Sequence, residues 1–133
     1  MTESFVIKIN NEFDIVLARQ KGREVSKELQ FGGVDQARIT TAISELARNI
    51  YLYAGSGQIT IQVLNENGRK GIQITAADNG PGINDIRMVL QDGFSTSGGL
   101  GAGLPGVKRL MDSFDIDSMP GSGTKITITK WAR

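Results

Sequence analysis

Asp78-Asn79-Gly80-Pro81-Gly82 and Gly98-Gly99-Leu100-Gly101-Ala102-Gly103-Leu104 are the two stretches that decide the fold of this chain. The first directly follows an apolar run, and the second precedes a pattern typical of a helix. Glycines at this density let the backbone turn sharply and bring its N–H groups close to a ligand, most often a phosphate. Asp78 adds one directional hydrogen-bond acceptor at the mouth of the first stretch. Together the two stretches predict a nucleotide-binding site.

The composition is that of an ordinary globular domain, with 133 residues, 39% of them hydrophobic and 22% charged. We expect a single domain spanning residues 1–133. The net charge of +1, with scattered basic residues, argues against binding to nucleic acid or to a membrane surface. The chain has no cysteine and no histidine, so proton abstraction must fall to Asp, Glu, Lys or Tyr. We expect a cytoplasmic protein.

Hydrophobic periodicity predicts alternating strands and helices. Asp35 is the expected N-cap of the second helix, and the Gly32-Gly33 pair is expected to end the first. The expected fold class is an α+β two-layer sandwich, with a mixed, mostly antiparallel sheet and helices on one face. Strands are expected at 4–10, 58–64, 71–76, around 116 and at 124–129, and helices at 14–29, 35–53, 83–90 and 105–114.

Glu45 and Asn49 are candidates for chemistry because they lie four residues apart on the second predicted helix. At this spacing two side chains lie one turn apart and about 40° from each other around the axis. Asn49 could give Mg²⁺ a neutral oxygen ligand, and Glu45 could orient or deprotonate an attacking group. On spacing alone the simpler interpretation is a solvated helix edge, with Glu45 paired to Arg48 or Arg38.

Asp78 ends an apolar strand pattern just before Gly80, Pro81 and Gly82. A carboxylate there could accept a hydrogen bond from the exocyclic amine of adenine, and would reject guanine by facing its carbonyl with a second acceptor. A plain Asp-Asn-Gly turn between a strand and a helix fits the same residues.

The loop over residues 92–104 combines glycines with hydroxyl side chains and leads into a predicted helix. Its N–H groups and the positive end of that helix suit a polyphosphate, although a flexible surface loop would have a similar composition. Gly101-x-Gly103-x-x-Gly106 matches the dinucleotide fingerprint, but it does not follow the first strand of a βαβ unit. No Gly-Lys-[Ser/Thr] follows the glycines, so a P-loop is also excluded.

In this order, the three motifs resemble the site of the GHKL ATPase/kinase superfamily, which has the Bergerat fold. Glu45-x-x-x-Asn49 resembles the N box, Asp78-x-Gly80-x-Gly82 the G1 box, and Gly99-x-Gly101-x-Gly103 the G2 box. Gly123-Thr124 resembles the threonine site that helps to hold adenine. The resemblance covers about Ile39 to Ile128.

This compact, histidine-free chain is most similar to the serine-kinase branch of the superfamily, the anti-sigma-factor kinases and the switch kinases of the stressosome. The resemblance implies an ATP-dependent serine/threonine-protein kinase that phosphorylates a STAS-domain scaffold or antagonist protein in a bacterial stress-response pathway. Switch kinases of this branch are also thought to activate a PP2C-type phosphatase once released. The implied ligands are ATP and Mg²⁺.

The resemblance also assigns roles to residues. Glu45 would be the catalytic base toward the acceptor hydroxyl, and Asn49 the Mg²⁺ ligand. Asp78 would read adenine, and the glycines of the second stretch would line the phosphates. The implied nucleotide-binding residues are Asn49, Asp78, Gly80, Gly82, Gly99, Gly101, Gly103, Leu104 and Thr124.

Two other classes of function remain open from the sequence. One is a non-catalytic regulator that binds an adenine nucleotide and captures a sigma factor or a phosphatase. The other is an ATP hydrolase module of a larger machine, against which the lack of a transducer domain argues. Transfer of phosphate to a protein partner separates a kinase from both.

Overall fold

The fold is given by a computed structural model that describes residues 3–82 and 103–132. Five strands form one sheet in the order β1-β2-β3-β5-β4, and each pairing among the described residues is antiparallel. The strands are β1 (Ser4–Ile9), β2 (Gly57–Glu66), β3 (Arg69–Asp78), β4 (Ser113–Ser118) and β5 (Thr124–Trp131).

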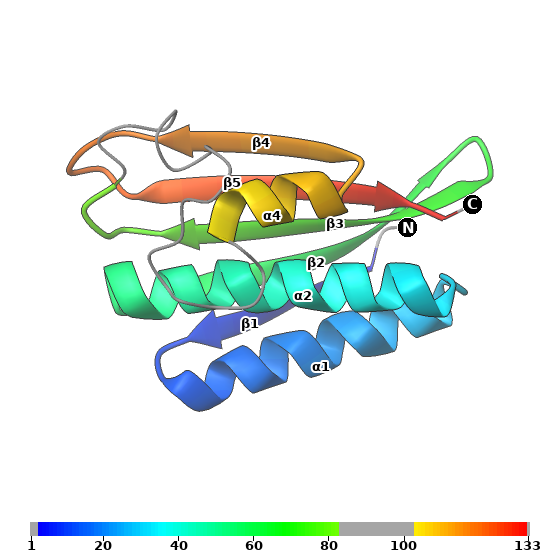
Figure 1. Cartoon of the computed structure of the whole chain (residues 1–133), viewed down its shortest axis with the longest axis horizontal. Helices are drawn as coiled ribbons and strands as arrows, with labels where there is room; N and C mark the ends of the chain where they lie inside the picture. Colours follow the sequence, from blue (N-terminus) through cyan, green and yellow to red (C-terminus); the bar gives the residue numbers. More distant parts are fainter. Residues whose placement is uncertain (1–2, 83–102, 133) are drawn as a thin grey trace.

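The helices α1 (Glu12–Glu28), α2 (Gly33–Asn49) and α4 (Gly103–Leu110) lie on one face of this sheet (Figure 1). A π-helical turn, η1 (Ile50–Ala54), continues α2. This arrangement confirms the predicted α+β two-layer fold. The core lies between the layers and is rich in isoleucine, because the inward positions of the strands alternate with polar ones on the open face. Its largest fully buried side chains include Ile39, Ile43, Ile59, Ile61, Ile72, Ile74 and Ile128.

The β2–β3 hairpin turns where the sequence predicts it. Asn67 and Gly68 both have positive φ, of 55° and 80°, as a tight hairpin turn between twisted strands requires. The strands on either side extend further than their apolar patterns, because polar residues continue the pairing as far as Glu66 and Arg69.

The boundary between α1 and α2 differs from the prediction. α1 starts earlier than expected, because Asn11 forms a capping box with Asp14. It ends at Glu28, and Gln30 takes the left-handed conformation with φ 64°. Gly32 is the N-cap of α2, so Asp35 lies inside the first turn rather than at the cap. The expectations that Asp35 caps α2 and that the glycine pair ends α1 are therefore wrong.

The predicted helix at 105–114 is also wrong at both ends. α4 begins at Gly103 and ends at Leu110, and the chain then enters β4. Strand pairing overrides the helical pattern here, because Ser113 is in register with Thr129 of β5 and Asp112 N already donates to the Thr129 carbonyl. The predicted helix at 83–90 lies outside the described residues.

The end of α2 departs from a regular α-helix. Gly55 N donates to the Ile50 carbonyl at 2.9 Å, an i to i+5 hydrogen bond that widens the last turn. The prediction extended the apolar stripe of α2 to Tyr53, but Tyr53 is 45% exposed. The wider turn rotates Tyr53 out of the position that an α-helix would give it.

Candidate nucleotide site

Asp78 is the last residue of β3 and lies on the sheet face that the helices cover. Its register partners are Gly57 on β2 and Thr124 on β5. Asp78 Oδ1 accepts a hydrogen bond from Gly80 N at 2.9 Å, so this carboxylate does shape the turn that follows the strand. A carboxylate has about four lone-pair positions, so the turn leaves acceptor capacity for a ligand.

Two of the glycines around Asp78 leave room for η1. A Cβ on Gly57 would lie 2.8 Å from Ile50 Cγ2, and one on Gly80 would lie 2.6 Å from Ala54 Cβ. Real Cβ atoms do not pack this closely, so both positions require glycine. The chain that continues α2 is thus packed against the Asp78 turn.

Two further glycines bring the β4–β5 connection to the same place. Gly82 has φ +78°, and a Cβ there would collide with the Met119 carbonyl. Gly123 has φ +86°, and a Cβ there would collide with the Asp78 carbonyl. Because both residues also need the left-handed conformation, only glycine fits without strain.

Thr124 lies opposite Asp78, and its hydroxyl is 2.8 Å from Ser118 Oγ. Ser118 Oγ can also donate to the Gly123 carbonyl at 3.0 Å. The hydroxyls of Ser118 and Thr124 are thus hydrogen-bonded to each other next to the Asp78 turn, and either of them could be the donor. Ser118 was missed from the sequence, because a serine at the end of an alternating strand is too common to single out.

Glu45 and Asn49 lie on the last turns of α2. Glu45 is only 4% exposed, and its Oε2 atom is buried with no hydrogen-bond partner in the part of the chain that the structure describes. Asn49 is half-buried and directly precedes η1. The burial of Glu45 excludes the solvated helix edge, and among the described residues Arg38 pairs with Asp35 rather than with Glu45.

Gly103 and Leu104 form the buried start of α4, which packs against α2. Leu104 is 6% exposed and belongs to the hydrophobic core cluster. Gly99 and Gly101 lie outside the described residues. The structure therefore brings Asp78, Thr124 and the end of α2 to one end of the sheet, and it places the close of the second glycine stretch against α2.

A depression of about 430 Å³ opens beside the Asp78 turn. Of the predicted site residues, Asp78 belongs to its lining, whereas Glu45, Asn49 and Thr124 do not. The depression lies over the ends of the first three strands, and its lining consists of Lys8, Asn10, Ala54, Ser56, Gly57, Gln58, Ala77, Asp78 and Asn79.

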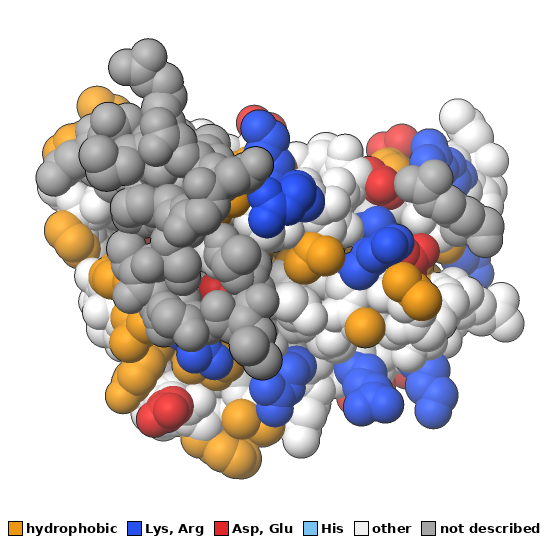
Figure 2. Space-filling view, viewed as in Figure 1, with side chains coloured by type: hydrophobic (Ala, Val, Ile, Leu, Met, Phe, Trp, Pro, Cys, Tyr) orange, Lys and Arg blue, Asp and Glu red, His pale blue; other side chains and the backbone are white. Residues whose placement is uncertain are grey.

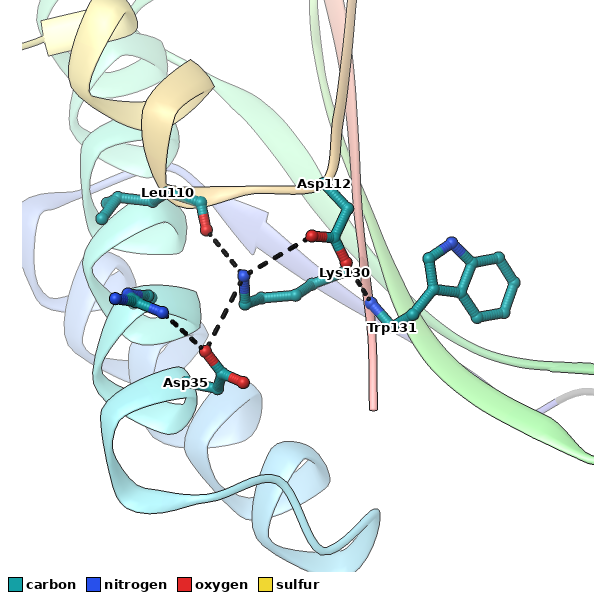
Figure 3. Close-up of polar contacts among 6 residues, drawn as sticks. Asp35, Leu110, Asp112, Lys130 and Trp131 are labelled. Carbon is teal, nitrogen blue, oxygen red and sulfur yellow. Dashed lines mark hydrogen bonds and ion pairs between the residues drawn. The ribbon is translucent and has the colours of Figure 1, made fainter. Parts of the chain in front are cut away.

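Lys130 fixes the far end of α4 (Figure 3). It is only 5% exposed, and its Nζ donates to the Leu110 carbonyl at 3.1 Å. Nζ also lies 3.8 Å from Asp35 Oδ1 and 3.9 Å from Asp112 Oδ1. Asp112 Oδ2 in turn accepts from Trp131 N at 2.8 Å. This Lys130 cluster joins the end of α4 to the first turn of α2 and to β5.

The described residues contain neither a cluster of metal-binding side chains nor a membrane-spanning helix. In the described ranges no group of three or more acidic side chains is placed to hold a metal ion. None of the helices within these ranges has the length and apolar character needed to cross a bilayer.

The fold and the three motifs define a GHKL-type ATPase domain. The chain belongs to the family of histidine kinase-, DNA gyrase B- and HSP90-like ATPases, whose sequence profile matches residues 34–133. This match confirms the resemblance seen in the sequence.

A particular relative extends the comparison to the whole chain. Serine/threonine-protein kinase RsbT of Bacillus subtilis (strain 168) is 65% identical over 133 residues, which is 100% of both chains. An anti-sigma F factor of Thermoanaerobacter sp. (strain X514) is 33% identical over 100 residues, covering 71% of this chain and 69% of that protein.

A solved structure agrees in fold. The RsbU and RsbW domains of a Mycobacterium tuberculosis protein align with a TM-score of 0.67 at 19% identity. The alignment covers 100% of this chain and 33% of the other chain. At this identity, the likeness supports the fold alone.

Proposed function

We propose that this chain is an ATP-dependent serine/threonine-protein kinase that phosphorylates a STAS-domain protein in a bacterial partner-switching pathway in the cytoplasm. The full-length identity to a protein named as a serine/threonine-protein kinase supports the activity. The resemblance to the anti-sigma-factor kinases supports the class of partner. A PP2C-type phosphatase is the second partner that we propose, from the likeness to the switch kinases.

The observation that carries the proposal is the buried Oε2 of Glu45, which has no hydrogen-bond partner among the described residues and lies one turn from Asn49. A buried carboxylate oxygen needs a hydrogen-bond donor, and the hydroxyl of a serine or threonine substrate is such a donor. In the reaction, that hydroxyl oxygen would bond to the γ-phosphorus, and the bond from this phosphorus to the bridging oxygen would break. ADP keeps the bridging oxygen, and Glu45 takes the hydroxyl proton.

The remaining residues would bind and orient. Asp78 would accept from the exocyclic amine of adenine, and the hydroxyl of Thr124 would support the same edge of the ring. Asn49 would hold Mg²⁺ through its side-chain oxygen; the fit is good, because Mg²⁺ in nucleotide sites takes one or two protein ligands beside phosphate and water. When bound, Mg²⁺ neutralises charge on the phosphates.

Glu45→Gln tests the proposal. The amide keeps the size of the side chain but cannot take a proton, so we expect phosphotransfer to a STAS-domain partner to fall by about 10²–10⁴-fold. ATP affinity, measured by calorimetry, should stay close to that of the wild type. Radiolabelled ATP, a purified STAS protein and single-turnover conditions give the rate.

Glu28→Gln, an exposed residue on α1, is the matched control and should transfer at the wild-type rate. Undiminished transfer by Glu45→Gln would remove Glu45 from the role of base. Wild-type protein that binds ATP but transfers no phosphate would instead favour a non-catalytic regulator, and steady phosphate release without a partner would favour a hydrolase.

A further inference from the structure

Arg48 has a buried side-chain nitrogen for which the described part of the fold provides no hydrogen-bond partner. Across residues 3–82 and 103–132, only two buried side-chain N or O atoms lack a hydrogen-bond partner, Glu45 Oε2 and Arg48 Nε. These residues are three positions apart on α2, so they occupy one turn of the helix. Buried polar atoms in native proteins nearly always have a partner. Two such atoms on one turn point to a ligand that binds there.

The two atoms do not serve each other. None of the ion pairs between described residues joins Glu45 to Arg48. Other charged side chains on α2 are paired, since Asp35 contacts both Arg38 and Lys130. Among the described residues, the charged side chains of α2 that lack a partner are therefore the two on its last turns, next to Asn49.

The chemistry of Arg48 defines the ligand that it needs. A guanidinium stays protonated in proteins and has only donors, so its buried nitrogen requires an acceptor, preferably an anion. Its planar fork of donors matches the oxygens of a phosphate group. Arg48 lies one helical turn from Glu45, the proposed base, and directly precedes Asn49, the proposed metal ligand, in the sequence of α2. The γ-phosphoryl group has to lie between the acceptor hydroxyl and the metal during transfer.

We propose that Arg48 binds the γ-phosphoryl group of ATP and stabilises it during transfer, an inference that rests on the proposed kinase activity. The guanidinium donates to the non-bridging oxygens while the bond to the acceptor oxygen forms and the bond to ADP breaks. Arg48 neither gains nor loses a proton, because Glu45 takes the proton of the hydroxyl. Donors fixed in place before the reaction stabilise the charge that spreads over these oxygens.

Arg48→Met tests this role, with Arg19→Met as the matched control, because Arg19 is an exposed arginine on α1. We expect Arg48→Met to slow transfer by at least about 10²-fold, since arginines on transferring phosphoryl groups contribute about 10³–10⁵-fold. It should weaken ATP binding more than ADP binding, because ADP has no γ-phosphate. Arg19→Met should change neither quantity.

Two further variants guard against a purely structural effect. Arg48→Lys keeps the charge without the fork and should fall between the wild type and Arg48→Met in transfer rate. Arg48→Ala should regain part of its transfer rate when millimolar guanidinium is added, which a collapsed site would not do. Circular dichroism of each variant reports whether it folds.

Several results would overturn the inference. One is a wild-type transfer rate in Arg48→Met, and another is an equal loss of ATP and ADP affinity. A third is a change confined to a higher KM for the protein partner, which would mean that Arg48 binds an acidic residue of that partner instead of the γ-phosphate. Strongly non-additive effects of Arg48→Met and Glu45→Gln on unfolding, without any effect on transfer, would indicate a structural pair. Wild-type protein without transfer would contradict the proposed function itself, so the two failures are distinguishable.

Discussion

Asp78 has two uses at the end of β3, and they make different demands on its carboxylate. One oxygen accepts from Gly80 N and shapes the turn. The proposed adenine contact needs a second acceptor, which asparagine replaces with a donor. We expect Asp78→Asn to fold with the same turn and to bind ATP more weakly by about 1–3 kcal/mol, because a buried donor would face the amine of adenine. Calorimetric titration with ATP measures this difference.

Asp117→Asn is the matched control for this variant, since Asp117 is an exposed residue on β4. Its ATP affinity should equal that of the wild type. If Asp78→Asn also binds ATP as tightly as the wild type, Asp78 belongs only to the turn and not to the purine site.

At the residue scale, the sequence predicts those site residues that stand out against the regular hydrophobic pattern of a strand or a helix. Asp78 ends an apolar run, and Glu45 and Asn49 share one side of a helix. Lys130 was missed, although it follows Ile126 and Ile128 at the inward positions of β5. Because every second residue of a strand faces the same side, a lysine two residues after Ile128 could have indicated a buried charge.

At the element scale, the Lys130 cluster holds α4 against α2 at the end away from the proposed nucleotide site. Lys130→Met keeps most of the apolar stem but leaves the Leu110 carbonyl and two carboxylates without their shared donor. We expect the free energy of unfolding to fall by about 1–3 kcal/mol, measured by urea denaturation. Hydrogen exchange should accelerate in α4 more than in β2.

The control for this variant is Lys125→Met, an exposed lysine on the same strand. It should change the unfolding free energy by less than about 0.5 kcal/mol. Equal stability of Lys130→Met and the wild type would mean that the cluster contributes no net stabilisation, as occurs for some buried ion pairs.

Helices and strands were predictable where their periods are long and clean, as in the middle of α2 and in the β2–β3 hairpin. Their ends were not, because competing local contacts decide them. Asn11 starts α1 early through its capping box, and Gly32 takes the cap that Asp35 was expected to provide. α4 stops early because pairing with β5 captures the chain at Ser113.

At the scale of the whole molecule, α1, α2 and α4 lie on one face of the sheet, and none of the described helices lies on the other (Figure 1). Figure 2 shows Lys and Arg side chains along the part of the helix face where α1 lies, with hydrophobic side chains near the start of that helix. Phe13 and Leu17 on α1 are 64% and 39% exposed. The surface charge is thus local and mixed, which agrees with a net charge of +1.

Nucleotide binding should stabilise the whole domain, because a ligand that binds only the folded state shifts unfolding by mass action. At an ATP concentration of about 100 times Kd, with Mg²⁺, we expect a gain of about 2.7 kcal/mol. GTP should give little gain, since Asp78 would face the carbonyl of guanine with an acceptor. Thermal unfolding with each nucleotide measures both effects, and equal gains from ATP and GTP would contradict the role of Asp78.

The π-helical turn η1 restricts how the chain can change in length during evolution. A π turn is equivalent to an α-helix with one residue inserted. Deleting a single residue between Ile50 and Ala54 would restore a regular helix and rotate everything after it by about 100°. Ala54 would then leave its place against Gly80. Homologues that keep this site should therefore conserve the number of residues in η1 more strictly than their identity.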